Sequence, residues 1–242
     1  MNIERSQITV SGLPVEIVRK GIKNLHLGVY PPNGRVRVAA PKRVHDEAIR
    51  LAVISRLGWI KRQRNRFQAQ ERQSAREYVS RESHYFLGRR YLLHIVEHEG
   101  PSRVCRRGRQ ILEVHVPKGA GKSQRERILL SWYRENLKRL IAPLVARWEA
   151  KVGVRVGSWG IRRMKTKWGS CNEGVCRIWL NLELAKKPVE CLEYIVVHEM
   201  VHLLERHHND RFTMLMDQHL PNWRVRRDEL NRAPLANENW RY

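Results

Sequence analysis

Two histidines four residues apart, with a glutamate directly after the first, form the pattern in this chain with the clearest chemical meaning. Residues 194–202 read YIVVHEMVH, which places the three side chains at His198, Glu199 and His202. Residues four apart on a helix project from one face, so both imidazoles can bind a single Zn²⁺ ion. The glutamate lies beside that ion, where its carboxylate can take a proton from metal-bound water. The pattern therefore predicts metal-assisted hydrolysis.

The competing interpretation of this segment is structural, with two buried histidines that have hydrogen-bond partners and Glu199 exposed to solvent. It is disfavoured, because two core histidines one turn apart are uncommon. The apolar residues 195–197 also fit a buried helix that presents one polar face.

A catalytic zinc site needs a third protein ligand and an open position. The candidates that follow the motif are His208 and its neighbour His207. On a continuous helix, His208 would lie about 15 Å along the axis from His198 and about 9 Å from His202, too far for metal–nitrogen distances near 2.1 Å. The helix must therefore end near residues 204–206, and the chain must turn back.

The helix after this turn is expected to begin at Asn209 or Asp210, because short polar side chains accept hydrogen bonds from the first free N–H groups of a helix. The alternative third ligand is a carboxylate from a later helix, either Asp228 or Glu229. We favour His208, and with it one zinc ion bound by three histidines.

The elements that position these residues are predicted from the spacing of apolar side chains. Apolar and polar residues alternate within 15–40 and 84–117, which predicts strands. A hairpin is expected around the turn at 31–34, and a polar turn is expected at 103–108. Apolar residues recur at helical spacing over 46–70 and 123–152, and Pro143 should kink the second helix. Short strands within 154–181 are expected next, then helices over 188–205, 210–219 and 222–232.

These elements predict an α+β protein with N-terminal antiparallel strands and helices, and with a C-terminal helical half that carries the HExxH helix. We divide the chain into a β-rich N-terminal region with one long helix, residues 1–120, and a second region, residues 121–242. Both are expected to pack as one continuous unit.

Composition excludes several classes of protein. With 42 % hydrophobic residues in 242, the chain can form a core and is not disordered. No run of 18 apolar residues and no secretory signal is present, which argues against a membrane protein or a secreted one. Four cysteines without a CxxC pair predict neither a disulfide framework nor a cysteine-rich zinc site, so we expect a cytoplasmic protein.

Charge is the unusual property of the chain. The formal net charge is +23, and the basic residues are distributed over both halves. Such a field attracts polyanions without regard to their sequence. Contact with nucleic acid through the basic surface is therefore one possible role, and simple solubility is the other.

Further motifs occur in a fixed order along the chain. They are FLGRRY at 86–91, WYR at 132–134, KTKWGSC at 165–171, LN at 180–181, the three histidines followed by Phe212, and LPNW at 220–223. In this order the chain resembles the YgjP-like metallopeptidases, a family related to the SprT-like zinc proteases. The resemblance extends from about residue 15 to residue 230.

The resemblance implies a zincin-like C-terminal half, one zinc ion held by three histidines, and Glu199 as the catalytic residue. Family members usually have a single histidine at the third-ligand position, whereas His207 and His208 are doubled here, so the ligand could shift by one residue. Some members are labelled UTP pyrophosphatases, so the resemblance leaves the substrate open.

Three functions follow from these observations. The first, which we favour, is a zinc metallopeptidase that cleaves a protein or peptide with Glu199 as general base. The second is a nucleoside triphosphate (UTP) pyrophosphohydrolase, which would use Mg²⁺ held by several carboxylates, although only four aspartates occur. The third is a nucleic-acid-binding protein with a structural zinc, which would need four protein ligands.

Other segments have two interpretations each. Residues 168–171, WGSC, are either a strand or loop that holds an extended substrate beside the cleft, or a structural turn. Tyr194 and Asn181 either lie near the metal, where Tyr194 could donate to an oxyanion, or pack in the core, which is favoured for both. His94 and His98 are four residues apart in a segment that alternates like a strand. We expect their side chains to lie on a face of the sheet and favour this over a second metal site.

Overall fold

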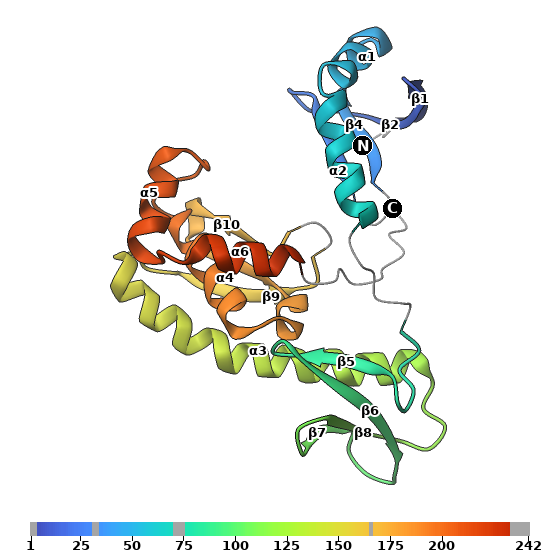
Figure 1. Ribbon diagram of the computed structural model, residues 1–242, viewed down its shortest axis with the longest axis vertical. Helices are drawn as coiled ribbons and strands as arrows, with labels where there is room; N and C mark the ends of the chain where they lie inside the picture. Colours follow the sequence, from blue (N-terminus) through green and yellow to red (C-terminus); the bar gives the residue numbers. More distant parts are fainter. Residues whose placement is uncertain (1–3, 31–33, 70–75, 165–166, 233–242) are drawn as a thin grey trace. The chain divides into compact units, whose positions relative to one another are not determined.

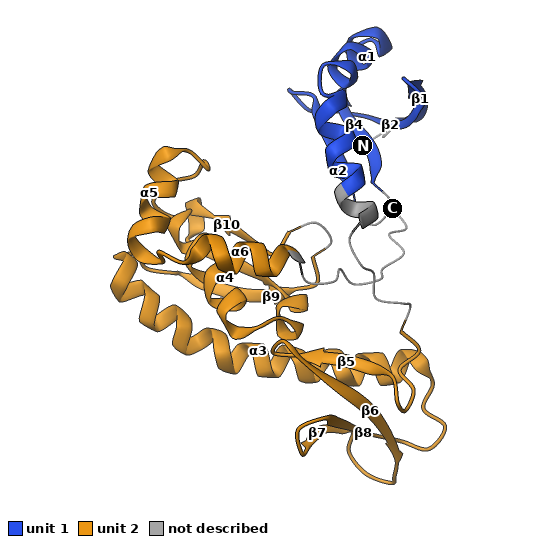
Figure 2. Cartoon of the chain, viewed as in Figure 1, with its two compact units in different colours: residues 1–74, 234–242 blue, residues 75–233 orange. Residues whose placement is uncertain are grey.

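The computed structural model describes residues 4–30, 34–69, 76–164 and 167–232, and Figure 1 shows the course of the chain. The chain forms two compact units, residues 1–74 with 234–242 and residues 75–233 (Figure 2). Residues 75–120, which the sequence analysis grouped with the N-terminal region, share their core with the C-terminal elements. The boundary between the units therefore lies at residues 74–75.

The first unit is a four-stranded sheet with two helices. Its elements are β1 (Glu4–Val10), β2 (Leu13–Lys20), β3 (His26–Tyr30), β4 (Arg35–Pro41), α1 (Asp46–Ile54) and α2 (Leu57–Ala69). The helix predicted over 46–70 is thus two helices. The break falls at Ser55, whose hydroxyl donates to the Ala52 carbonyl at 3.0 Å and so competes with the helical backbone.

The sheet of the first unit is mixed, not antiparallel throughout as predicted. Its order is β1-β2-β4-β3, and β2 pairs with β4 in parallel while the other two pairings are antiparallel. The β3–β4 hairpin was expected, but its return strand and not its first strand lies beside β2. Strand β1 was not predicted, because its side chains are mostly exposed and only Val10 is buried.

The second unit begins with a sheet of the same topology. Its strands are β5 (Ser83–Phe86), β6 (Arg89–Glu97), β7 (Arg103–Arg107) and β8 (Ile111–Val116), in the order β5-β6-β8-β7. The pairing of β6 with β8 is again parallel. In both sheets the last strand leads into Pro-Lys, at 41–42 and 117–118, and then to a helix. The chain thus repeats one four-stranded arrangement.

Helix α3 (Lys122–Val152) joins the two sheets of the second unit. It contacts β7 and β8 of the first sheet and β9 of the second, and Figure 1 shows it as a single long helix. Pro143 lies inside it without ending it. The helix ends at Gly153, which adopts the left-handed conformation that glycine permits (φ +74°).

The C-terminal part of this unit holds a three-stranded sheet and three helices. They are β9 (Ser158–Arg162), β10 (Gly169–Asn172), β11 (Arg177–Asn181), α4 (Val189–Val201), α5 (Asp210–His219) and α6 (Trp223–Arg232), with the short 3₁₀ helices Glu173–Val175 and Leu182–Lys186. The sheet order is β10-β11-β9, so β10 is an edge strand among the strands described. The structure confirms the short strands and the three helices expected between residues 154 and 232.

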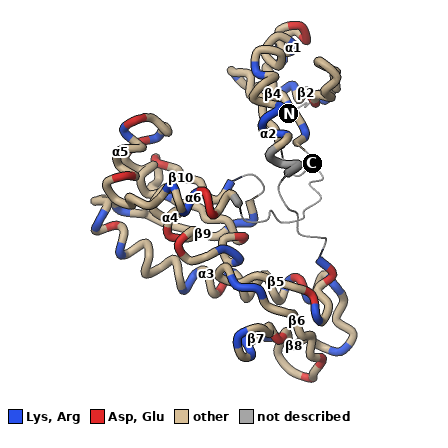
Figure 3. Tube along the Cα trace, in the orientation of Figure 1, with Lys and Arg blue, Asp and Glu red and all other residues tan. Residues whose placement is uncertain are grey.

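Two surface properties of the described residues bear on function. None of their helices is long and apolar enough to span a membrane. Lys and Arg occur on the elements of both units, with acidic residues between them (Figure 3). Charge is therefore not confined to a single segment.

Candidate metal centre

Helix α4 carries the first part of the motif and lies among α3, α5, α6, β10 and β11. Apolar residues surround most of its circumference, so nearly the whole helix is buried. Glu199 shares this burial and is only 4 % exposed. The helix is therefore a fixed support for the side chains that it presents to the cavity described below.

The chain turns back directly after α4, as the spacing of the histidines requires. The helix ends at Val201, earlier than predicted, and His202 is its C-cap. The N–H groups of residues 203–204 bond to carbonyls three residues back, both at 2.9 Å, which tightens the last turn. The turn brings His208 Nε2 to 3.1 Å from His198 Nε2.

Three histidines form a group with metal-binding geometry. The ligand nitrogens of His198, His202 and His208 all lie within 4.8 Å of one another. Within the described ranges, no other three or more His, Cys, Asp or Glu side chains come together in this way. The predicted third position, His208, is thus the one that the fold brings to the pair on α4.

Backbone geometry orients one of these rings. His202 Nδ1 lies 3.1 Å from the Glu205 carbonyl oxygen. A carbonyl oxygen can only accept, so Nδ1 carries the proton and Nε2 keeps its lone pair for a metal. By contrast, the Nδ1 atom of His198 is buried and has no hydrogen-bond partner among the described residues.

The three imidazoles fit a zinc ion. Two nitrogens bound to tetrahedral zinc at about 2.1 Å lie about 3.4 Å apart, close to the 3.1 Å between His198 Nε2 and His208 Nε2. Burial lowers the pKa of His198 to about 3, and the charges of the other two histidines add to this effect. Burial likewise lowers the pKa of His208. Both rings are thus held in the neutral form that binds metals.

Glu199 lies against the backbone of β10. A Cβ atom added at Gly169 would be 2.4 Å from Glu199 Oε1 and 2.7 Å from its Cδ and Cγ. Any other residue would force Glu199 or the strand to shift, because real Cβ contacts are essentially never shorter than 3.0 Å. Burial raises the pKa of Glu199 to about 8, and the positive charge of Lys167 opposes the rise. The glycine of the WGSC motif therefore leaves the space that the Glu199 carboxylate occupies.

Asn181 holds the segment that leads into β10. Its side-chain amide donates to the carbonyls of Met164 and Lys167, both at 2.8 Å. Its side-chain oxygen accepts from the N–H of Met164 at 3.3 Å and of Glu183 at 3.2 Å, and its own N–H donates to the Trp168 carbonyl at 2.9 Å. Asn181 is buried, as predicted, but it acts through this network and not through apolar packing.

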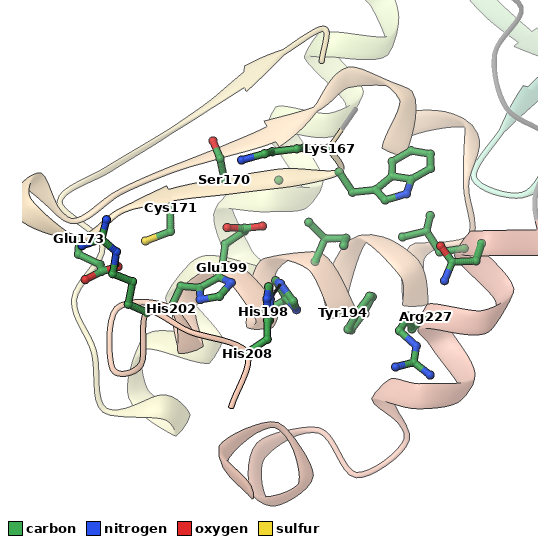
Figure 4. A pocket seen from close by; sticks show the side chains of 16 residues that line it. Lys167, Ser170, Cys171, Glu173, Tyr194, His198, Glu199, His202, His208 and Arg227 are labelled. Atoms are coloured by element: carbon green, nitrogen blue, oxygen red, sulfur yellow. Dashed lines mark hydrogen bonds and ion pairs between the residues drawn. The ribbon is translucent and has the colours of Figure 1, made fainter. Parts of the chain in front are cut away.

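The histidines and Glu199 open on a cavity of about 490 Å³. Figure 4 shows the Glu199 carboxylate pointing toward β10, with the imidazoles on its other side. The lining residues are Lys167, Trp168, Gly169, Ser170, Cys171, Glu173, Tyr194, Ile195, His198, Glu199, His202, Arg206, His208, Arg227, Leu230 and Asn231. A hydrolytic site needs such a cavity beside its metal ligands, and a closed structural metal site does not.

The model of the YgjP-like metallopeptidase domain family matches residues 23–233. The chain belongs to this family. The match includes every element from β3 to α6 and confirms the resemblance that the motifs indicated. A metallopeptidase domain works with a metal ion, typically zinc, and the three-histidine group is where this YgjP-like domain can hold one. No curated protein matches the chain.

The alternative ligands of this YgjP-like domain lie outside the histidine group. His207 is exposed, and its backbone N–H donates to the Glu205 carboxylate at 3.1 Å. Asp228 pairs with Arg227 on α6 at 3.3 Å, and Glu229 is also on that helix. His94 lies on the exposed face of β6, 3.4 Å from Glu113, and belongs to no such group either.

Two further side chains of the cavity have structural surroundings that limit their chemistry. Tyr194 stacks on Trp223 (ring centroids 6.2 Å, 13°) and meets His198 edge-on at 5.7 Å, and burial raises its pKa to about 12. Burial and the charge of Glu199 raise the pKa of Cys171 to about 12. The thiol therefore stays protonated, and a protonated thiol is a poor nucleophile.

Sequence reasoning missed two contributions to this YgjP-like site. The carbonyl of Glu205 orients His202, and nothing in a residue type predicts where a backbone carbonyl will point. Phe212 was noted only as a motif position, yet it is buried against the imidazoles. The available signal was its place on the helix predicted directly after His208.

Proposed function

We propose that this chain is a zinc-dependent metallopeptidase in which His198, His202 and His208 hold one zinc ion and Glu199 is the general base. One observation supports this above the others. Three imidazoles converge at a cavity, and the carboxylate that follows the first of them reaches the same cavity. This is the arrangement that metal-assisted hydrolysis requires.

A bound zinc ion polarises a substrate carbonyl and lowers the pKa of water. The residues of the chain supply the remaining steps. Glu199 accepts a proton from the attacking water and returns it to the leaving amine. Its position is fixed by burial on α4 and by contact with Gly169, so it is aligned before substrate arrives.

An extended peptide is the substrate that the cavity wall favours. Strand β10 pairs with β11 on one side and is the edge of its sheet among the strands described. Residues 169–171 of this edge line the cavity beside Glu199. A peptide can add to such an edge as a further strand and bring one of its carbonyls to the histidines.

The rival functions find less support in the cavity. Nucleotide pyrophosphohydrolysis uses Mg²⁺ held by several carboxylates, whereas Glu173 and Glu199 are the only carboxylates among the described lining residues. Glu173 lies 3.9 Å from the Arg206 guanidinium. A structural zinc would have four protein ligands, and the group described here has three.

Partners and compartment follow as parts of the same proposal. The substrate is a protein or peptide, and contact with nucleic acid rests on the net charge of +23 alone. All four cysteines are free thiols. Free thiols fit a reducing compartment, the cytoplasm.

The decisive experiment compares the zinc-loaded wild type with Glu199→Gln on an unstructured protein, with fragments identified by mass spectrometry. Glutamine keeps the size of the side chain but cannot accept the proton. We expect fragments from the wild type only, and equal zinc content in both proteins. Fragments from both would remove Glu199 from the mechanism. Absence of fragments from both, with nucleotide hydrolysis by the wild type, would replace the peptidase by the pyrophosphohydrolase.

A further inference from the structure

Phe212, on α5, contacts all three imidazoles of the proposed metal centre. Its ring centroid lies 5.0 Å from that of His198, 4.8 Å from that of His202 and 4.7 Å from that of His208. The side chain is only 3 % exposed. A single rigid ring thus touches every ligand.

The start of α5 fixes the position of this ring. Asn209 is the N-cap of the helix, and its side-chain oxygen accepts from the Phe212 N–H at 2.9 Å. The residue before the cap is His208. This one capping hydrogen bond therefore fixes the position of the Phe212 backbone and the direction in which the chain leaves the turn that carries His208.

Hydrogen bonds alone leave two of the three rings without a fixed orientation. A ligating histidine usually donates its second ring N–H to a carboxylate or a carbonyl, which holds the ring in place. His202 has such a partner in the Glu205 carbonyl. The Nδ1 atom of His198 is buried without a partner, and the one close polar contact of the His208 ring among the described residues is with Nε2 of His198, which is itself a proposed ligand.

We propose that Phe212 is a positioning residue that takes the place of these missing hydrogen bonds. Its ring meets His198 at 69° and His208 at 81°, both edge-on, and lies at 33° to His202. These are packing angles that aromatic rings prefer over a face-to-face stack. The Phe212 ring limits rotation of the imidazoles, so that the histidine side chains lose less conformational entropy when the metal binds. This inference rests on the ligand set given under the proposed function.

The test is zinc affinity, measured by competition with a chromophoric chelator. Phe212→Leu keeps an apolar side chain but removes the flat ring, and Phe212→Tyr restores a ring of the same kind. Met216 provides the matched control, because it is also on α5 and fully buried but has no ring that could pack against the imidazoles in the way that Phe212 does. Met216→Ala disturbs the packing of α5 but leaves the Phe212 ring in the sequence.

We expect Phe212→Leu to weaken zinc binding by about tenfold to a hundredfold, the range found when an outer-shell partner of a ligand is lost. Phe212→Tyr should restore most of the affinity. Met216→Ala should lower the thermal midpoint but leave zinc affinity within about threefold of the wild type, since outer-shell effects need contact with a ligand. At saturating Co²⁺, the visible absorption bands should change in Phe212→Leu and not in Met216→Ala.

Two results would overturn the proposal: wild-type zinc affinity in Phe212→Leu, or an equal loss in Met216→Ala. The readout needs no substrate, which separates it from the proposed activity. A wild-type chain that binds zinc tightly but cleaves no protein counts against the peptidase alone, and the affinities of the variants still decide the role of Phe212. A wild-type chain that binds no zinc overturns both.

Discussion

Gly169 and Glu199 are in direct contact, although they belong to different elements. A Cβ atom at position 169 would lie 2.4 Å from Glu199 Oε1. Glu199 is buried, with only 4 % of its surface exposed. Glu199 has little room to move away. The edge strand β10 and the helix α4 can therefore approach as they do only if residue 169 is glycine.

Gly169→Ala should reduce peptidase activity without removing the metal. The added methyl group has to displace the carboxylate, and a displacement of about 1 Å can cost about a hundredfold in rate. Zinc content should stay equal to that of the wild type, because no imidazole is touched. Gly174→Ala is the matched control, since its Cβ would meet only Asn172 Oδ1 at an ordinary 3.6 Å. Equal kcat/KM for Gly169→Ala and the wild type would show that the contact has no bearing on the reaction.

His208→Ala should lower zinc affinity far more than His207→Ala. The loss should exceed the roughly tenfold to hundredfold loss seen when only an outer-shell partner is removed. His207 is the ideal control, because it is the adjacent residue of the same type and lies outside the histidine group. Metal content after dialysis against a chelator gives the ranking. The reverse order would transfer the ligand role to His207.

The part of the site on α4 was predictable because a four-residue spacing on a helix fixes which side chains share a face. The turn before His208 also followed from distance alone. The contact of Gly169 with Glu199 was not predictable, because it depends on which strand becomes the edge beside α4. The position of β10 beside α4 depends on packing between residues far apart in sequence, so no local sequence pattern predicts it.

The fold shows the same division between local and non-local information. The β3–β4 hairpin was indicated by alternation on both sides of a turn. The β7–β8 hairpin was not, because residues 103–108 were expected to form a polar turn, whereas Arg103–Arg107 is a strand that pairs with β8. The parallel pairings of β2 with β4 and of β6 with β8 were not, because alternation does not say which strand of a hairpin docks on the sheet. Likewise Asn181 was expected to pack in the core, but its hydrogen-bond network spans residues 164–183 and needs the tertiary fold.

Asn181→Ala should destabilise the second unit by about 2–3 kcal/mol, because a buried hydrogen-bond network loses its partner and leaves backbone groups unpaired. Urea unfolding measures this loss. Asn136→Ala is the control: among the described residues its amide donates to the Trp132 carbonyl of its own helix alone, at 2.8 Å, so a change of less than about 1 kcal/mol is expected. Comparable losses in the two variants would mean that the Asn181 network adds nothing beyond an ordinary helix contact.

Glu193 should make the packing of α4 between α3 and α6 dependent on pH. Its carboxylate pairs with Arg147 and accepts from Trp148 Nε1 at 3.0 Å, both on α3, and it pairs with Arg226 on α6. Burial raises the pKa of Glu193, but the hydrogen bonds from Arg226 and Trp148 and the charges of both arginines outweigh burial, so the pKa is lowered from 4.5. A lowered pKa in the folded state means that the carboxylate stabilises the fold above the ordinary pKa and ceases to do so as pH falls through the folded value.

Glu193→Gln should therefore lower the free energy of unfolding by about 1–3 kcal/mol at neutral pH, the size of a hydrogen bond to a charged group. The difference from the wild type should shrink as the pH falls below 4.5, the ordinary pKa of this carboxyl. Glu135→Gln serves as the control, because its pair with Lys138 on α3 is half exposed and such pairs contribute little. Urea unfolding of the three proteins between pH 3 and pH 8 gives the comparison. A difference between wild type and Glu193→Gln that stays constant, or grows, toward low pH would show that the charge of Glu193 does not hold α3, α4 and α6 together.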